Sequence, residues 1–133
     1  MARLGCECGY VIPDHELGLD YKALLISDKN FFFDFADWFV NEVQGYMTAA
    51  QNGNVRQWLL DNGYGENYVN LNLDHGNIML DHIFHRKFFD IKKDVYECTK
   101  CGRLYVEGKN NDFFPYSPNS GSFNGAIKLN KGD

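Results

Sequence analysis

The sequence lacks the long apolar run that a membrane-spanning helix needs. A span takes about twenty consecutive apolar residues, and the apolar run Phe31-Phe32-Phe33 is interrupted at once by Asp34 and Asp37. The opening Met-Ala-Arg-Leu-Gly also holds no apolar segment of the kind found in secretion signals. We therefore expect a cytoplasmic protein that does not associate with a membrane.

The motifs of several large enzyme classes are missing as well. No glycine-rich phosphate loop follows a strand pattern, no serine lies in a strand-turn-helix elbow, and no two histidines stand four apart with glutamate after the first. Asp14, His15 and Glu16 could supply acid-base chemistry, but a polar turn after Pro13 explains them more simply. We expect no catalytic residues and no enzymatic activity.

Length and charge favour one acidic domain over residues 1–133. The chain is 44% hydrophobic and includes 8 Tyr, 11 Phe and 2 Trp, enough for a real core. The net charge of -5 is uneven, because residues 1–84 carry 4 Lys/Arg against 12 Asp/Glu, whereas residues 85–109 carry 7 against 4. An acidic surface favours a basic protein partner, although acidic surfaces also simply aid solubility.

The only four cysteines form two short pairs, Cys6-Glu7-Cys8-Gly9 and Cys98-Thr99-Lys100-Cys101-Gly102. A tight turn brings two thiolates together, and the glycine that follows permits a backbone whose amides point at the sulfurs. Two such turns complete a tetrahedral donor set. The sequence therefore predicts one structural Zn²⁺ site made of Cys6, Cys8, Cys98 and Cys101.

Several alternatives to this zinc site stay open. One residue rather than two separates Cys6 from Cys8, so either the first turn is distorted or His15 replaces a ligand. Disulfides, free redox thiols and an iron-sulfur cluster also use paired cysteines. Zinc is favoured because cytosolic thiols stay reduced and no other redox signal accompanies the cysteines.

Strand-like residues surround both cysteine pairs, namely Tyr10 to Ile12, Val95-Tyr96 and Leu104 to Val106. This layout resembles the two knuckles of a zinc ribbon, here residues 6–9 and 98–102. The acidic chain, with a knuckle at its start and the later motif Tyr-Glu-Cys-x-x-Cys-Gly-Arg-Leu, is also similar to uncharacterised bacterial proteins, some of them toxin-immunity-like. The resemblance implies a protein that binds another protein.

The segment between the knuckles, about residues 28–90, predicts a helical insertion. Apolar residues recur at helical spacing and Asn-Gly pairs end two of the helices. With short strands on either side, the predicted class is α+β, a small antiparallel sheet with an amphipathic helix packed across it, followed by a flexible tail beyond about residue 120. The predicted elements are a strand at Tyr21–Ile26, helices from Lys29 (N-cap Asp28) to about Gln51, at Val55–Asp61 and from Asp74 to about Phe88, and an extended segment at Gly65–Leu73.

The first helix has six aromatic residues in the nine positions from Phe31 to Phe39, too many for one face. Burial on more than one side is the expectation, and exposed rings on a protein-binding surface are the alternative. An acidic, aromatic face of this helix is the predicted partner surface, with Asp34, Asp37, Trp38 and Glu42 as its contact residues.

Two further residue sets define alternative functions. The basic segment around the second knuckle predicts, as the alternative to a protein partner, contact with nucleic acid. The histidines favour surface or partly buried positions over a second metal site, with His85 pairing Asp81 one helical turn away. The basic set is Lys87, Lys92, Lys93, Lys100 and Arg103, and the histidine set is His75, His82 and His85.

Overall fold

The structure, a computed structural model, describes residues 3–129 and divides the chain into two compact units. The sheet unit lies within residues 1–25 and 92–133, and the helical unit is Ile26–Ile91. The chain is α+β, with two small antiparallel sheets rather than the single one expected. That a helix packs across a sheet stays a prediction. Over the described residues, no helix combines the length and apolar character that crossing a membrane requires.

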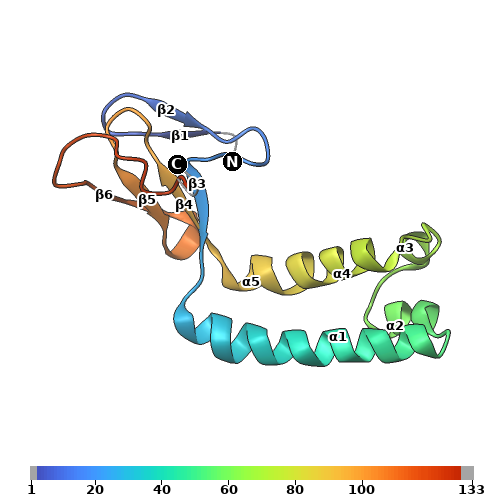
Figure 1. Ribbon diagram of the computed structural model, residues 1–133. Helices are drawn as coiled ribbons and strands as arrows, with labels where there is room; N and C mark the ends of the chain where they lie inside the picture. Colours follow the sequence, from blue (N-terminus) through green and yellow to red (C-terminus); the bar gives the residue numbers. More distant parts are fainter. Residues whose placement is uncertain (1–2, 130–133) are drawn as a thin grey trace. The chain divides into compact units, whose positions relative to one another are not determined.

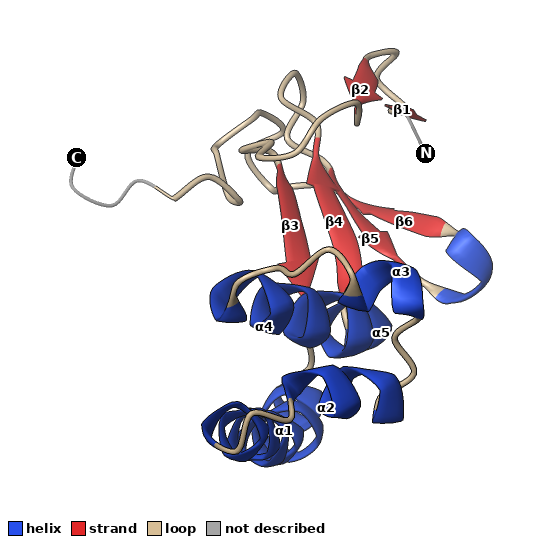
Figure 2. Ribbon diagram, turned by 90° about the vertical axis from the view of Figure 1, so that its right-hand side faces the viewer, coloured by secondary structure: helices blue, strands red, loops and turns tan. Residues whose placement is uncertain are grey.

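The sheet unit contains a two-stranded hairpin and a four-stranded sheet (Figures 1 and 2). All neighbours are antiparallel, in the order β3-β4-β5-β6, so the chain passes from β4 through β5 to β6 as a meander. The strands are β1 (Arg3–Gly5), β2 (Val11–Pro13), β3 (Lys22–Leu25), β4 (Lys93–Glu97), β5 (Leu104–Glu107) and β6 (Phe113–Tyr116).

The strand register decides which side chains share a face of the four-stranded sheet. Lys22 is opposite Tyr96, and Tyr96 is opposite Tyr105. Residues directly opposite one another in an antiparallel pair lie on the same face. This face contributes Tyr96 and Tyr105 to a small core, which also contains Ile12 of β2 and the buried sulfurs of Cys6 and Cys98.

The helical unit consists of α-helices and two π-helical segments, Asn30–Phe35 and Phe84–Phe88. Figure 1 shows α1 and α4 running side by side, and the core between the helices is formed by Tyr46, Leu59, Val69 and Ile78. The α-helices are α1 (Ala36–Gln51), α2 (Val55–Asp61), α3 (Glu66–Val69), α4 (His75–Ile83) and α5 (Phe89–Ile91).

The helical stretch that leads through the first π-helical segment into α1 begins at Asp28, one residue before the predicted Lys29. The Asn30 amide donates to Ser27 Oγ at 3.1 Å, so Ser27 rather than Asp28 satisfies a free N–H group of the first turn. In α4 the predicted start is right, because Asp74 Oδ1 accepts from the Asn77 amide at 2.9 Å.

The extended segment predicted for Gly65–Leu73 is wrong, because it contains the short helix α3. The alternation of apolar and polar residues was misleading, since Val69 is buried while Leu71 is 61% exposed. After α3 the chain reverses at Asn72, which has a φ of +52°. Asparagine adopts this left-handed conformation more readily than most residues.

The aromatic residues before α1 are largely exposed. Phe32 is 56% exposed and Phe33 is 70% exposed, so burial on more than one side is wrong for both rings. Phe35 is the residue that packs inward, with its ring centroid 5.0 Å from that of Phe88. The second interpretation of this cluster, a surface with exposed rings, is the one that fits.

Part of the tail is held by a buried carboxylate of β4. The amides of Ala126 and Ile127 donate to Glu97 at 3.0 and 3.3 Å, and Glu97 is only 1% exposed. Flexibility of the tail beyond about residue 120 stays a prediction, and residues 130–133 lie outside the described part of the chain.

Candidate metal centre

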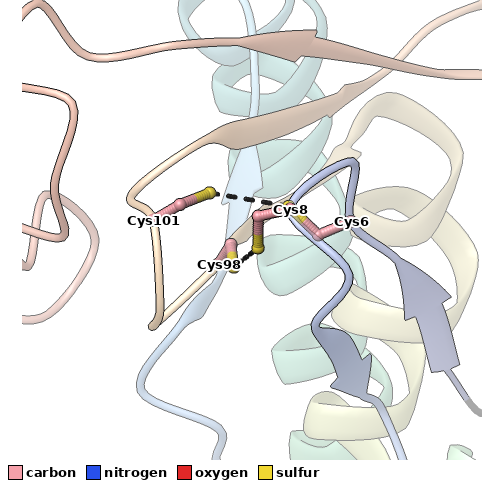
Figure 3. Close-up of side chains that lie close together, drawn as sticks. All are labelled: Cys6, Cys8, Cys98 and Cys101. Atoms are coloured by element: carbon pink, nitrogen blue, oxygen red, sulfur yellow. Dashed lines mark hydrogen bonds between the residues drawn. The ribbon is translucent and has the colours of Figure 1, made fainter.

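The two knuckles bring all four cysteine sulfurs together (Figure 3). Cys6 Sγ lies 3.6 Å from Cys101 Sγ, and Cys8 Sγ lies 3.7 Å from Cys98 Sγ. All four sulfurs lie within 4.8 Å of one another. The closest pairs join one knuckle to the other, so residues about ninety positions apart meet at a single point.

These distances fit a metal ion better than disulfides. Sulfurs at the corners of a tetrahedron about 2.3 Å from a central Zn²⁺ are about 3.8 Å apart, whereas a disulfide bond is about 2.05 Å long. The four cysteines are therefore arranged as a donor set that could hold one metal ion.

The shorter spacing of the first knuckle does not disrupt its turn. In the second knuckle the Cys98 amide donates to the Arg103 carbonyl at 2.9 Å, and the Gly102 amide donates to the Cys98 carbonyl at 2.8 Å. In the first, the Cys6 amide donates to Tyr10 at 2.8 Å and the Gly9 amide to Cys6 at 2.9 Å. The two turns share one hydrogen-bond pattern, and each bond of the first spans one residue fewer.

The glycine after each cysteine pair is required by backbone geometry. Gly9 has a φ of +95° and Gly102 has a φ of +83°, in the left-handed region that disfavours side chains. At Gly102 there is also no space for a side chain, because a Cβ would lie 2.8 Å from the Ser122 carbonyl carbon. The tail therefore passes directly over the second knuckle.

Burial and hydrogen bonds have opposite effects on the two buried thiols. Burial raises the pKa of Cys6, but donors that include the Tyr105 hydroxyl and the Cys8 amide outweigh it and lower that pKa to about 6. Burial also raises the pKa of Cys98, and there it dominates despite the Cys101 and Lys100 amides, so the pKa reaches about 12. Four thiols this close cannot all be ionised without a cation among them.

Arg103, which follows the second knuckle, contacts one of its sulfurs. Its Nη1 donates to Cys101 Sγ at 3.4 Å, and its Nε lies 3.8 Å from a carboxylate oxygen of Glu7. Tyr105, which the sequence did not single out, donates toward Cys6 and accepts from the Glu7 amide at 3.0 Å. Arg103 and Tyr105 therefore hold the knuckles from outside the donor set.

No histidine is needed to complete the donor set. His15 is exposed and its nearest ionic contact is Glu16, 3.9 Å away. Within residues 3–129, the four cysteines are the one group of three or more potential metal ligands close enough together for an ion. The second site considered for His75, His82 and His85 is therefore not formed by the described residues.

Each of these three histidines has a different environment. His75 Nδ1 lies 2.6 Å from the Tyr46 hydroxyl, and exposed His85 pairs with Asp81 at 3.5 Å as predicted. His82 is 2% exposed, with Nε2 2.8 Å from Glu42 Oε1 and Nδ1 2.7 Å from the Tyr64 hydroxyl. Because a carboxylate accepts, we assign the ring proton to Nε2, which leaves Nδ1 to accept from Tyr64.

The His82 environment changes the roles of two predicted partner residues. Trp38 stacks on His82 with ring centroids 5.3 Å apart, and Glu42 hydrogen-bonds to it, so both face the interior of the helical unit. Asp34 and Asp37 are exposed. The sequence missed this cluster because Glu42 and His82 are forty residues apart, and only the pairing of α1 with α4 joins them.

Most of the predicted nucleic-acid residues already have partners. Lys92 Nζ lies 2.7 Å from Asp94, Arg103 contacts Cys101, and Lys87 lies 5.8 Å from the centre of the Trp38 ring. Lys93 and Lys100 are exposed. Side chains held in this way are less available to phosphates than the basic segment suggested.

The chain belongs to the family described as Domain of unknown function (DUF8617), whose model matches residues 2–120. The match covers both knuckles and the helical unit. No curated protein and no solved structure matches the chain.

Proposed function

We propose that this protein is a non-enzymatic interaction module, in which zinc stabilises the sheet unit and the helical unit binds a basic protein partner. The sulfur geometry supports the zinc. An iron-sulfur cluster distributes four thiolates over two or four irons, so some of the sulfurs lie further apart than they do around one ion. Here all four sulfurs lie within 4.8 Å of one another. The distances of 3.6 and 3.7 Å fit a single tetrahedral ion.

The observation that carries the partner proposal is a groove between α1 and α4. It has a volume of about 430 Å³, its lining is almost wholly apolar, and Met47 at its edge is 51% exposed. Apolar grooves between paired helices are common docking sites for amphipathic segments. The lining residues are Val43, Tyr46, Met47, Ala50, Gln51, His75, Gly76 and Met79.

Charge identifies the kind of partner. Residues 26–91 carry 4 Lys/Arg against 9 Asp/Glu, a net charge of -5, whereas the rest of the chain carries 9 of each. The whole excess of negative charge therefore belongs to the unit that contains the groove. The negative charge of this unit would repel a second copy of the chain and attract a basic amphipathic helix. A bacterial immunity-type protein that binds a basic toxin would be one case of this activity.

The partner proposal is tested with two designed helical peptides, one of Leu and Lys and the other of Leu and Glu. We expect the Lys peptide to shift amide resonances of the groove residues in a ¹⁵N spectrum of the zinc-loaded chain, and the Glu peptide to have no effect. Met47→Lys should abolish binding. Val40→Lys is the matched control, because Val40 is 64% exposed on the same helix but does not line the groove.

Equal binding of the two peptides, or equal loss of binding in both variants, would refute the groove as the docking site. Zinc is tested separately by native mass spectrometry, where we expect one zinc ion per chain. A chain that purifies folded and without metal would refute the zinc assignment.

A further inference from the structure

A second cavity, in the sheet unit, has a polar lining that the proposed function does not use. Its volume is about 430 Å³, within the range of small-molecule sites. The register of the four-stranded sheet explains its composition, because Lys22 and Tyr96, and likewise Glu107 and Phe113, are opposite one another and so share a face. The lining residues are Asp14, Lys22, Asp94, Tyr96, Glu107, Asn111 and Phe113.

One carboxylate of this cavity is already neutralised by the protein. Asp14 accepts from Lys22 Nζ at 3.1 and 3.2 Å and from the Tyr96 hydroxyl at 2.5 Å. The side chains of Asp14 and Lys22 are 12% and 29% exposed, so the pair is partly withdrawn from water. Lys22 and Asp14 therefore form a fixed wall of the cavity rather than its binding group.

The other two carboxylates each retain an unused oxygen. Glu107 Oε1 accepts from the Asp94 amide at 2.8 Å, and Asp94 Oδ1 accepts from Lys92 Nζ at 2.7 Å. For Glu107 Oε2 and Asp94 Oδ2, no hydrogen bond from residues 3–129 is found. Three carboxylates and the Lys22 ammonium group line the cavity, and the Lys92 ammonium group pairs with Asp94, so the net charge at the site is -1.

We propose that this cavity binds an organic cation through a guanidinium or primary ammonium group, held by Asp94 and Glu107. A guanidinium presents several N–H donors in a plane, which matches the two unused oxygens. The Phe113 ring, 5.5 Å from that of Tyr96, supplies an aromatic wall that attracts cations. Anions are disfavoured by the charge, and within residues 3–129 no set of three carboxylates lies close enough together for a metal ion.

This cation could come from a free small molecule or from an arginine side chain of a peptide. The chemistry recognised is the same in both cases, and the site is independent of the α1/α4 groove. The two proposals are therefore independent: refuting the groove would not refute the cation site, and refuting the cation site would not refute the groove.

The probes are agmatine, an arginine-containing peptide, and the same peptide with citrulline, which keeps the shape of arginine but has no charge. Calorimetry on the zinc-loaded full chain should show binding of agmatine, of the arginine peptide, or of both, and no binding of the citrulline peptide. Binding of agmatine identifies a free small molecule as a sufficient ligand. Binding of the arginine peptide alone identifies a side chain.

Glu107→Gln is the informative variant, because the glutamine carbonyl can still accept from the Asp94 amide while the charge is removed. We expect affinity for the cation to fall about tenfold. Glu16→Gln removes an exposed carboxylate of the same unit and should change nothing. Equal binding of citrulline, unchanged affinity in Glu107→Gln, or binding of Ca²⁺ without any organic cation would overturn the proposal.

Discussion

The two units of this chain are stabilised in different ways. The sheet unit has a small core in which buried cysteines lie beside tyrosines and Ile12, and the sulfurs of its two knuckles meet at one point. The helical unit encloses an aromatic and aliphatic core with His82 hydrogen-bonded inside it. The comparison predicts that the sheet unit depends on an ion held by its four cysteines, whereas the helical unit folds without one.

The largest effect expected is from Cys98→Ser, which tests this difference directly. Because metal binding and folding are coupled in thiolate sites, the sheet unit should lose its zinc and unfold. The amide resonances of residues 26–91 should keep their dispersion. Loss of structure in both units, or a folded sheet unit without metal, would contradict the distinction drawn between them.

His82→Ala tests the helical unit in the same way. The substitution removes a buried ring together with hydrogen bonds to Glu42 and Tyr64, so we expect a loss of about 3 kcal/mol in the free energy of unfolding. Zinc content should not change. The control is His85→Ala, which removes an exposed pair with Asp81 and should cost less than about 0.5 kcal/mol in urea denaturation.

Alanine substitutions at the two knuckle glycines, Gly9 and Gly102, should have a smaller effect on stability and can be compared directly. Alanine at Gly9 is disfavoured by its positive φ alone, at about 1 kcal/mol, since no atom lies within 4 Å of the added Cβ. At Gly102 the Cβ also collides with the backbone at Ser122, which adds about 1 to 3 kcal/mol. In thermal unfolding, Gly102→Ala should have a lower melting temperature than Gly9→Ala. Equal melting temperatures would disprove the close contact between Gly102 and the tail.

Acid should weaken the sheet unit through Asp14 as well as through its thiolates. Although burial raises the pKa of Asp14, hydrogen bonds from Tyr96 and Lys22 outweigh it and lower that pKa. A lowered folded pKa gives stability that is present above the unfolded value, near 3.9, and is lost as pH falls toward the folded one.

Every tenfold difference between the folded and unfolded acid dissociation constants of Asp14 contributes about 1.4 kcal/mol to the free energy of unfolding. The measurement is urea denaturation at pH 6 and at pH 3 for wild type and Asp14→Asn. Since acid protonates the cysteine thiolates of both proteins alike, the effect of Asp14 is the part of the pH dependence that the variant lacks. Identical pH dependence in the two proteins would contradict it.

The sequence was most informative where local chemistry decides the structure. The cysteine pairs predicted which ends meet, and Asn62-Gly63 marked the end of α2 correctly because glycine supplies the left-handed residue. It was least informative where a contact joins distant residues. Glu42 and His82 lie on different helices, and Asp14 reaches Tyr96 across eighty-two positions. Neither contact has a local signal, since each depends on how elements pair.

The contact between Glu97 and the C-terminal segment determines how far the chain can be shortened without loss of the metal site. The buried carboxylate of Glu97 lies one residue before Cys98 and accepts from the amides of Ala126 and Ile127. A protein cut before Ala126 would leave that carboxylate without both donors, beside a cluster of thiolates that already repel negative charge. A chain that ends at residue 120, where the family match ends, should therefore retain the proposed metal less well, although every cysteine would still be present.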